Sequence, residues 1–370
     1  MTFLSFLNRI GVKPKQHGFT KHRATSLVTR FSRNRGLHLS KPSLQMIPAE
    51  VDTRVMFRDF APTSSDMASE VLAGLSQTPK TISPKYLYDE YGSHLFDEIT
   101  RVPEYYPSRT EIGILEACRE EVADLIGKRI FMVEYGSGTS EKVRLLLEVL
   151  RPSGYMPIDI SKEFLLNAAT RLAGDYPWLN VFPTCADYSK PVELPDVDDE
   201  YAVMAFFPGS SLGNFDPESA VGFLRNVAKT VGVGSYLLIG IDRKKQRGVL
   251  EKAYNDNAGV TEAFNLNLID RVNRDLDGTL QRTGFRHIAV YNETLGRIEM
   301  HLECVQPHEA RVAGNTVRFD ADERIHTESS YKYTPEEFSV LAGSAGFSVA
   351  KHFTDENDLF SVFLCRVEME

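Results

Sequence analysis

Three residues beside one short apolar run have the types and spacing of a cofactor-binding loop. Glu134 follows the apolar residues 130–133, and Gly136 and Gly138 come two and four positions later. Glycine lets the backbone approach a ligand closely, because no Cβ intrudes. Apolar residues then recur with the period of a helix over 143–150. Strand, glycine turn and helix in this order build a ligand crevice at the carboxyl edge of an α/β sheet.

The spacing of the glycines distinguishes between two cofactor classes. A dinucleotide fingerprint requires a third glycine three residues after the second, and Glu141 occupies that position, which disfavours NAD. Acid-x-Gly-x-Gly after the first strand is typical of the S-adenosylmethionine loop of Rossmann-like methyltransferases. An ordinary strand-to-helix turn is the alternative. We also expect the side chain of Ser140 or Thr139 to cap the following helix.

Polar side chains also stand at the ends of the next predicted strands. Asp159 lies 23 residues after Gly136, where a carboxylate can accept hydrogen bonds from both hydroxyls of an adenosine ribose. Asp187 and Tyr188 follow the third strand, where a methyltransferase contacts adenine. Asn214 lies in the loop after the fourth strand, and its amide offers a donor and an acceptor to a zwitterion.

The elements that position these residues follow an α/β pattern. Five short apolar segments alternate with helical patterns up to Asp242, which predicts a Rossmann-like sheet of parallel strands. Alternating residues near 287–305 and 309–319 predict antiparallel strands. Residues 346–368 read as two strands around a polar turn, which closes the sheet with an antiparallel hairpin.

The change of pattern after Asp242 predicts the domain boundaries. We expect 46–242 with 333–370 to form the Rossmann-like domain, and 243–332 to form an inserted α+β domain for substrate binding. The first 49 residues carry nine Lys or Arg and no acid. Such a segment is typical of a transit peptide, and an upstream start codon with Met46 as the natural beginning gives the same pattern. We therefore expect 1–45 to be disordered or not native.

Composition limits the possible partners. After residue 49 the chain holds 33 Lys and Arg against 51 Asp and Glu, an acidic balance that argues against nucleic-acid binding. No apolar run approaches the roughly 18 residues that a membrane span needs. The four cysteines form no CxxC pair, and the nine histidines show no metal-ligand spacing. We expect a cytoplasmic protein, a monomer, that acts on a small molecule without a metal.

A segment rich in aromatic residues precedes the glycine loop. Residues 84–111 contain five tyrosines and Phe96. Such rings can form the wall of a ligand pocket, with hydroxyls that orient the ligand. Packing of a tyrosine-rich surface on the core is the alternative. Ser108 and Glu111 have the spacing of a capping box, which predicts the start of a helix.

Several segments taken together resemble the histidine Nα-methyltransferases of ergothioneine biosynthesis, part of a wider group that methylates amino-acid amines. The resemblance covers about residue 84 to the C-terminus. The segments that carry it are YLYDEYGSHLFDEITRVPEYYPSRTE, EYGSGTSEK, GSSLGNF, YNDNAGVTEAFNLNLIDRVNRDL, RIEMHL and IHTESSYKY. The resemblance implies S-adenosylmethionine-dependent methylation of the α-amine of L-histidine, with three transfers giving the betaine hercynine.

The resemblance also implies roles for single residues. Tyr88 matches the tyrosine near the reacting amine, and Asn214 with Tyr254 matches the pair that holds the substrate's carboxylate and amine. Tyr88 and Asn214 are thereby the candidate catalytic residues. Lys142 lies close to the methionine carboxylate. The implied cofactor contacts are Tyr88, Gly136, Lys142, Asp159, Asp187 and Tyr188.

The remaining implied residues concern the substrate ring. Tyr105 borders the ring, and Met300 lines the imidazole pocket. Glu328 and Ser330 match the two residues that hydrogen-bond the imidazole nitrogens. Methyl transfer from a sulfonium is an in-line displacement, so the protein must hold a neutral amine and the methyl group in line. No histidine falls among these residues, so the amine proton is expected to reach water through Tyr88 or Asn214.

Three other functions remain open. The same fold could act on another amino-acid amine, such as a tryptophan derivative, although an apolar ring would leave Glu328 and Ser330 without partners. A catalytically silent adenosine-binding module is the second, and intact Asn214, Tyr254 and Glu328 argue against it. An NAD oxidoreductase is the weakest, because of Glu141.

Overall fold

The computed structural model describes residues 54–60, 64–127, 129–198 and 200–368. The predicted N-terminal extension, residues 1–45, lies outside the described residues. No helix of the described part is long and apolar enough to cross a membrane.

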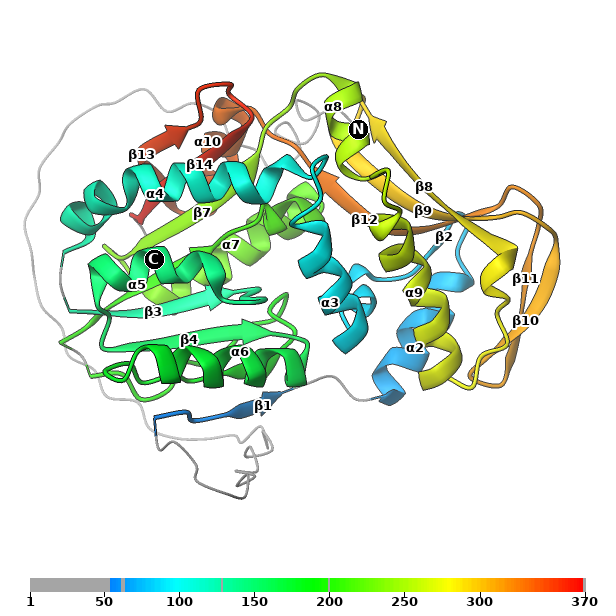
Figure 1. Ribbon diagram of the computed structural model, residues 1–370, viewed down its shortest axis with the longest axis horizontal. Helices are drawn as coiled ribbons and strands as arrows, with labels where there is room; N and C mark the ends of the chain where they lie inside the picture. Colours follow the sequence, from blue (N-terminus) through cyan, green and yellow to red (C-terminus); the bar gives the residue numbers. More distant parts are fainter. Residues whose placement is uncertain (1–53, 61–63, 128, 199, 369–370) are drawn as a thin grey trace, which may run out of the picture. The chain divides into compact units, whose positions relative to one another are not determined.

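An eight-stranded sheet forms the larger part of the fold (Figure 1), in the order β1-β5-β4-β3-β6-β7-β14-β13. The first six strands in this order run parallel, β14 is antiparallel to β7, and β13 is antiparallel to β14. The predicted Rossmann-like sheet with an antiparallel C-terminal hairpin is confirmed. Its strands are β1 (Arg58–Phe60), β3 (Ile130–Tyr135), β4 (Gly154–Asp159), β5 (Thr184–Ala186), β6 (Ala202–Phe207), β7 (Tyr236–Asp242), β13 (Phe347–Thr354) and β14 (Phe360–Val367).

Helices cover both faces of this sheet, which explains its continuous apolar strands. All six residues of β3 are buried, as expected for a parallel strand covered on both sides. In Figure 1, α4, α5 and α6 lie in front of the strands, and α7 and α10 lie behind them. The strand order reverses between β3 and β6, which places a ligand crevice at their carboxyl ends. These helices are α4 (Tyr106–Ile126), α5 (Glu141–Leu150), α6 (Lys162–Asp175), α7 (Pro217–Val231) and α10 (Pro335–Ser344).

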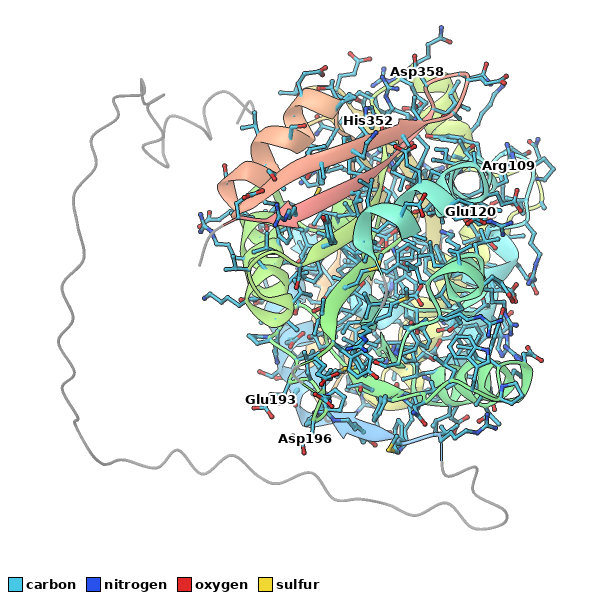
Figure 2. The ribbon with its side chains drawn as sticks, turned by 90° about the vertical axis from the view of Figure 1, so that its left-hand side faces the viewer. Arg109, Glu120, Glu193, Asp196, His352 and Asp358 are labelled. Atoms are coloured by element: carbon cyan, nitrogen blue, oxygen red, sulfur yellow. The ribbon has the colours of Figure 1, made fainter. Side chains whose placement is uncertain are left out.

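Figure 2 shows the edge of the large sheet at the C-terminal hairpin, with His352 on β13 and Asp358 in the turn before β14. The Asp358 carboxylate pairs with Arg243, which directly follows β7. The polar turn predicted between the two last strands therefore lies where its charged side chains reach water.

A four-stranded sheet in the order β2-β12-β9-β8 forms the second part, with a separate hairpin of β10 and β11. The pairs β8–β9 and β9–β12 are antiparallel, which confirms the predicted antiparallel strands. The short strand β2 belongs to this sheet although it lies outside residues 243–332. The division of the chain at 242 and 333 stays a prediction. The strands are β2 (Lys80–Thr81), β8 (Phe285–Asn292), β9 (Arg297–Cys304), β10 (His308–Val312), β11 (Asn315–Phe319) and β12 (Arg324–Tyr331).

Strand β12 contains a bulge that determines which side chains face the core. Ile325 pairs with Leu302, but Glu328 pairs with Met300, so the register shifts by one residue between His326 and Glu328. Leu302 and Met300 are two apart on β9 and share a face. Ile325 and Glu328 therefore share that face too, although they are three residues apart.

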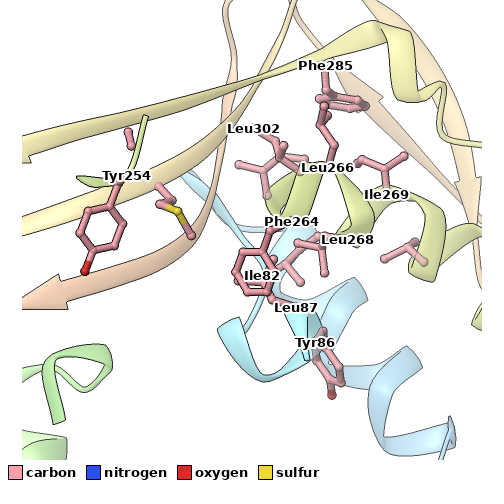
Figure 3. Packing of buried hydrophobic residues seen from close by; sticks show 14 of the residues in the cluster. Ile82, Tyr86, Leu87, Tyr254, Phe264, Leu266, Leu268, Ile269, Phe285 and Leu302 are labelled. Carbon is pink, nitrogen blue, oxygen red and sulfur yellow. The ribbon is translucent and has the colours of Figure 1, made fainter. Parts of the chain in front are cut away.

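Helix α9 covers the inner face of the smaller sheet. Its buried Phe264, Leu268 and Val272 form one stripe, as their four-residue spacing predicts. Figure 3 shows Phe264 and Leu268 among the buried side chains between α9 and the preceding segments. The other helices are α2 (Ser64–Leu75), η1 (Pro84–Leu87), α3 (Glu90–Ile99), η2 (Ser211–Asn214), α8 (Arg247–Ala253) and η3 (Arg282–Gly284).

The helix caps show where local sequence patterns are sufficient to predict the start of a helix. Thr334 and Glu337 form a capping box at α10, as their spacing predicts. Asp216 caps α7, since its carboxylate accepts hydrogen bonds from two backbone N–H groups of the first turn. The predicted side-chain cap of α5 is wrong, because the cap residue Ser140 has a left-handed backbone with φ 57° and makes no cap hydrogen bond. Thr139 does not occupy the cap position.

The predicted capping box of Ser108 and Glu111 is also wrong. Helix α4 begins at Tyr106, so both residues lie inside it and are buried. The Glu111 carboxylate instead accepts hydrogen bonds from the backbone N–H of Gly209 at 2.9 and 3.0 Å and pairs with Lys142 at 2.5 Å. Tertiary partners therefore determine the position of this carboxylate.

Gly240 on β7 leaves the space that this carboxylate fills. A Cβ at Gly240 would lie 1.9 Å from Glu111 Oε1. We expect Gly240→Ala to lower the free energy of unfolding by roughly 1–3 kcal/mol through overpacking. Gly222→Ala in α7 is the control, because its Cβ would meet nothing within 4 Å, and should be neutral or stabilise by up to about 1 kcal/mol. Urea unfolding measures both, and a Gly240→Ala protein as stable as the wild type would contradict this account.

Candidate active site

A cavity of about 510 Å³ lies at the carboxyl ends of β3, β4, β5 and β6. The loop after β3 forms one wall, where Gly136 and Gly138 have φ of 67° and 50°, a region that favours glycine. Glu134 at the end of β3 is fully buried and accepts a hydrogen bond from the Tyr155 hydroxyl. Burial raises the pKa of Glu134 to about 8, despite the opposing effects of Tyr155 and the Lys142 charge.

Asp159 joins the second strand to the glycine loop. Its Oδ2 accepts a hydrogen bond from the Gly138 N–H at 3.0 Å, and its Oδ1 accepts one from the Ser161 N–H at 3.0 Å. Burial raises the pKa of Asp159, and these N–H donors only partly offset the rise. The carboxylate thus lines the cavity in a fixed orientation, as ribose recognition requires.

Asp187 and Tyr188 form the next part of the wall. Asp187 accepts a hydrogen bond from Ser189 Oγ at 2.5 Å and pairs with Lys85 at 3.2 Å. Burial would raise the pKa of Asp187, but these two partners outweigh it and hold the pKa below its usual value. The Tyr188 ring packs against Phe207 with centroids 5.9 Å apart.

The cavity has unfilled hydrogen-bonding capacity that fits a polar cofactor. Ser137 Oγ lines it and is buried with no hydrogen-bond partner among the described residues. Lys142 brings a positive charge and Asp159 a carboxylate to the same cavity. An adenosine ribose and an amino-acid carboxylate are groups that this set of donors and acceptors can bind.

A smaller cavity of about 40 Å³ adjoins the first. Residues of α8, α9, β9 and β12, or directly beside them, close its far side, among them Tyr254, Met300, Glu328 and Ser330. The two cavities share the lining residues Tyr88, Phe96, Tyr105, Gly209, Ser211 and Asn214. A ligand in the small cavity therefore lies next to a ligand in the large one.

Glu328 is the acidic residue of the small cavity. Its Oε1 accepts hydrogen bonds from Asn214 Nδ2 at 3.0 Å and from the Tyr88 hydroxyl at 3.3 Å. Burial raises the pKa of Glu328 to about 7, although Tyr88, the Lys332 charge and Asn214 act in the opposite direction. The carboxyl group therefore changes charge near neutral pH.

Tyr254 and Ser330 form a hydrogen-bonded pair beside Glu328. The Tyr254 hydroxyl donates to Ser330 Oγ at 2.9 Å, and Lys332 Nζ donates to both oxygens, at 2.9 and 2.8 Å. Figure 3 shows the Tyr254 hydroxyl pointing away from Phe264 and its neighbours. The ring of Tyr105 stands edge-on to that of Tyr254 at 6.0 Å.

Among the described residues, no group of three or more His, Cys, Asp or Glu could hold a metal ion. The four cysteines are free and buried. Hydroxyl, amide, carboxyl, ammonium and guanidinium groups are the polar side-chain groups that line the two cavities.

Comparison with known proteins identifies the family. Residues 67–367 match the family of SAM-dependent, histidine-specific methyltransferases. The chain belongs to this family. S-adenosylmethionine is its cofactor, as the glycine spacing predicts, and the family that the sequence resembles is confirmed.

Three relatives show the range of the similarity. Histidine N-alpha-methyltransferase of Mycolicibacterium smegmatis is 37% identical over 313 residues, which cover 81% of this chain and 96% of that protein. Ergothioneine biosynthesis protein 1 of Neurospora crassa is 31% identical over 76% of this chain and 32% of that protein. L-tryptophan methyltransferase trpM of Psilocybe serbica is 26% identical over 81% of this chain and 92% of that protein.

The structure brings the predicted site residues together in two groups. The residues predicted for the cofactor all line the large cavity: Tyr88, Gly136, Lys142, Asp159, Asp187 and Tyr188. Those predicted for the substrate all line the small one: Tyr105, Asn214, Tyr254, Met300, Glu328 and Ser330. The tyrosine-rich segment fits both interpretations, since Tyr88 and Tyr105 line cavities and Tyr86 and Tyr106 are buried in the core. The role of each residue stays a prediction.

Thr261 and Glu111 are among the lining or supporting residues that sequence reasoning missed. Thr261 in α9 lines the small cavity, and its hydroxyl is buried without a hydrogen-bond partner among the described residues. Glu111 holds Lys142 and the Gly209 N–H together between the two cavities. No local pattern marks Thr261, and the local pattern at Glu111 indicated a helix cap.

We expect Asp159→Ala to weaken S-adenosylmethionine binding about 10- to 150-fold, the effect of losing hydrogen bonds to a charged acceptor. Asp159 lines only the large cavity, so histidine affinity should change little. Glu163→Ala on α6 removes a neighbouring exposed carboxylate and is the control. Calorimetric titration measures both ligands, and unchanged cofactor affinity in Asp159→Ala would remove this residue from the site.

Glu328 should make the stability of the ligand-free protein depend on pH. The folded pKa of Glu328, about 7, lies above the ordinary 4.5. Its contribution to the free energy of unfolding is therefore full below about pH 4.5 and is lost as the pH rises through 7. Glu328→Gln removes this dependence. From pH 5 to 8 the variant should therefore gain roughly 2.5 kcal/mol relative to the wild type. Denaturant unfolding at each pH checks this, with the exposed Glu163→Gln as the control that should show no such trend.

Proposed function

We propose that this protein transfers methyl groups from S-adenosylmethionine to the α-amine of L-histidine. Three transfers would give hercynine, the first step of ergothioneine biosynthesis. The observation that carries the proposal is the pair of adjoining cavities, in which Tyr88 and Asn214 line both and Glu328 and Ser330 line only the smaller. Membership of a histidine-specific methyltransferase family supports it.

The large cavity supports a role in holding the cofactor, which supplies an electrophilic methyl group on a sulfonium. Asp159 would accept the ribose hydroxyls, and Lys142 would bind the methionine carboxylate. Glu111 already pairs with Lys142 and so fixes where its charge lies. Asp187 and Tyr188 would border the adenine.

The small cavity supports recognition of an imidazole ring. Glu328 Oε1 is engaged by Tyr88 and Asn214, and its other oxygen, Oε2, makes no hydrogen bond within the described residues. Imidazole offers an N–H and a bare ring nitrogen, which would serve Glu328 and Ser330 together. A phenyl ring would leave the buried carboxylate without its partner, at a cost of roughly 1–3 kcal/mol or more. An indole ring offers one N–H donor but no bare ring nitrogen, so it would leave Ser330 without a partner.

Tyr88 and Asn214 would position the reacting amine at the boundary of the two cavities. The amine must be neutral, because only a free lone pair can attack the methyl carbon. Orientation of the two reactants is the main contribution that the protein makes to such a displacement. Among the described residues no histidine lines either cavity, so the amine proton would pass to water by way of Tyr88 or Asn214.

We infer a monomer that acts in the cytoplasm. Both cavities are complete within one chain, which supports activity without a partner subunit. The free, buried cysteines suit a reducing compartment.

The direct test is mass spectrometry of free amino acids incubated with the protein and S-adenosylmethionine. We expect L-histidine to gain one, two and three methyl groups, and L-tryptophan to react far more slowly. A protein that methylates tryptophan and leaves histidine unchanged would favour the alternative substrate class, which the name of the relative trpM indicates.

Substrate choice should depend on Glu328. We expect Glu328→Ala, alone or with Met300→Val to widen the pocket, to lower kcat/KM for histidine by roughly 10²- to 10⁴-fold. Tryptophan and phenylalanine should gain relative to histidine, because no buried carboxylate then opposes an apolar ring.

The control for this prediction is Glu299→Ala. Glu299 lies on the neighbouring strand β9 and pairs with Arg297, and it lines neither cavity. Histidine turnover in Glu328→Ala within about twofold of the wild type, less than about 0.5 kcal/mol on the transition-state scale, would refute the imidazole-recognition role.

A further inference from the structure

Two ionised side chains lie buried behind the small cavity without lining it. Lys332 and Asp242 are both 0% exposed, and Lys332 Nζ lies 2.8 Å from Asp242 Oδ2. Neither residue lines the large or the small cavity, and the proposed methyl transfer does not use them. Burying a charge costs free energy, and a buried pair is often no more stabilising than apolar residues of the same size, so stability alone does not explain this pair.

Asp242 is held from several directions. The Tyr106 hydroxyl donates to both carboxylate oxygens at 2.7 and 2.8 Å, and Lys245 Nζ lies 2.5 Å from Oδ1. Burial would raise the pKa of Asp242, but the charges of Lys332 and Lys245 outweigh it and keep the pKa below its usual value. Asp242 is therefore a fixed anion that can anchor Lys332.

Lys332 uses all three of its N–H donors. One goes to Asp242 Oδ2 at 2.8 Å, one to Ser330 Oγ at 2.8 Å and one to the Tyr254 hydroxyl oxygen at 2.9 Å. An ammonium group can only donate. Both hydroxyl oxygens must therefore accept from Lys332, and their own protons must point elsewhere.

The two hydroxyl protons can then be placed. Tyr254 donates its proton to Ser330 Oγ at 2.9 Å, so the Ser330 oxygen already accepts two hydrogen bonds. The Ser330 proton has no acceptor among the described residues and is free for the cavity that Ser330 lines. If a ligand carboxylate takes the Tyr254 proton instead, Ser330 donates to Tyr254. In either case the pair presents one proton to the ligand.

We propose that Lys332, anchored by Asp242, is a positioning residue that orients the hydroxyl protons of Tyr254 and Ser330 toward the substrate. The inference rests on the proposed function. While Tyr254 donates to Ser330, the free proton of the pair lies on Ser330, so the ring nitrogen that faces Ser330 must be the bare one and the ring N–H must face Glu328. In this arrangement the network selects a neutral imidazole in one of its two tautomers.

The test is Lys332→Met, with Lys245→Met as the matched control. Both substitutions remove a lysine from the same carboxylate and leave Asp242 with Tyr106 and the other lysine, but Lys245 touches neither Tyr254 nor Ser330. We expect Lys332→Met to raise KM for histidine roughly 10- to 100-fold, as for loss of hydrogen bonds to a charged group. S-adenosylmethionine affinity and kcat should change far less. Lys245→Met should leave KM within about twofold.

A double-mutant cycle tests whether Lys332 acts through the two hydroxyls. In a Tyr254→Phe/Ser330→Ala background, Lys332→Met should change kcat/KM for histidine by less than about threefold. Thermal unfolding of every variant accompanies the kinetics. If Lys332→Met does not fold, Asp242→Asn/Lys332→Met removes both opposite charges and carries the same expectation.

Three results would overturn the inference. The first is an unchanged KM for histidine in Lys332→Met, and the second is an equal rise of this KM in Lys245→Met. The third is an undiminished effect of Lys332→Met on kcat/KM in the Tyr254→Phe/Ser330→Ala background. Wild-type turnover of histidine in the same assay separates the two proposals. If the wild type does not methylate histidine, the proposed function itself fails. If it does and Lys332→Met behaves as the wild type, only the positioning role fails.

Discussion

The close approach of the loop after β6 to strand β12 is the constraint on which the site depends. A Cβ at Gly213 would lie 2.7 Å from the Tyr331 carbonyl oxygen and 3.0 Å from its nitrogen, so only glycine fits between η2 and β12. This contact carries the next residue, Asn214, to within hydrogen-bonding distance of Glu328. The loop after β6 of the larger sheet and strand β12 of the smaller sheet therefore meet because two backbones touch.

Under the proposed function, the Glu328 carboxyl group would connect recognition of the two ends of the substrate. One of its oxygens already accepts hydrogen bonds from Tyr88 and Asn214, which border the large cavity, while the other would face the substrate ring. The charge of so buried a group depends on what occupies the cavity, since a ring N–H donor would favour the ionised form. Ring binding and the orientation of the amine-side donors would thus be linked through one side chain.

Local patterns and the family resemblance predict much of this structure, and long-range contacts account for the rest. The glycine loop, the α9 stripe and the α10 capping box depend on neighbours within a few residues, and the structure contains all three. Glu111 has a cap-like spacing, but its partners Lys142 and Gly209 lie 31 and 98 positions away. The role proposed for Lys332 likewise depends on Asp242, which is distant in the sequence and which the fold places beside it.

The bulge in β12 gives the small cavity its polarity. Before it, Ile325 and Thr327 turn inward, where Thr327 bonds to Asn265 of α9; after it, Glu328 and Ser330 do. A single extra residue therefore reverses the odd-even alternation of the strand, because successive side chains point to opposite faces. A relative lacking that residue would line the same space with the opposite set of side chains, so chain length alone, with no change of residue type, could redirect which amino acid this fold accepts.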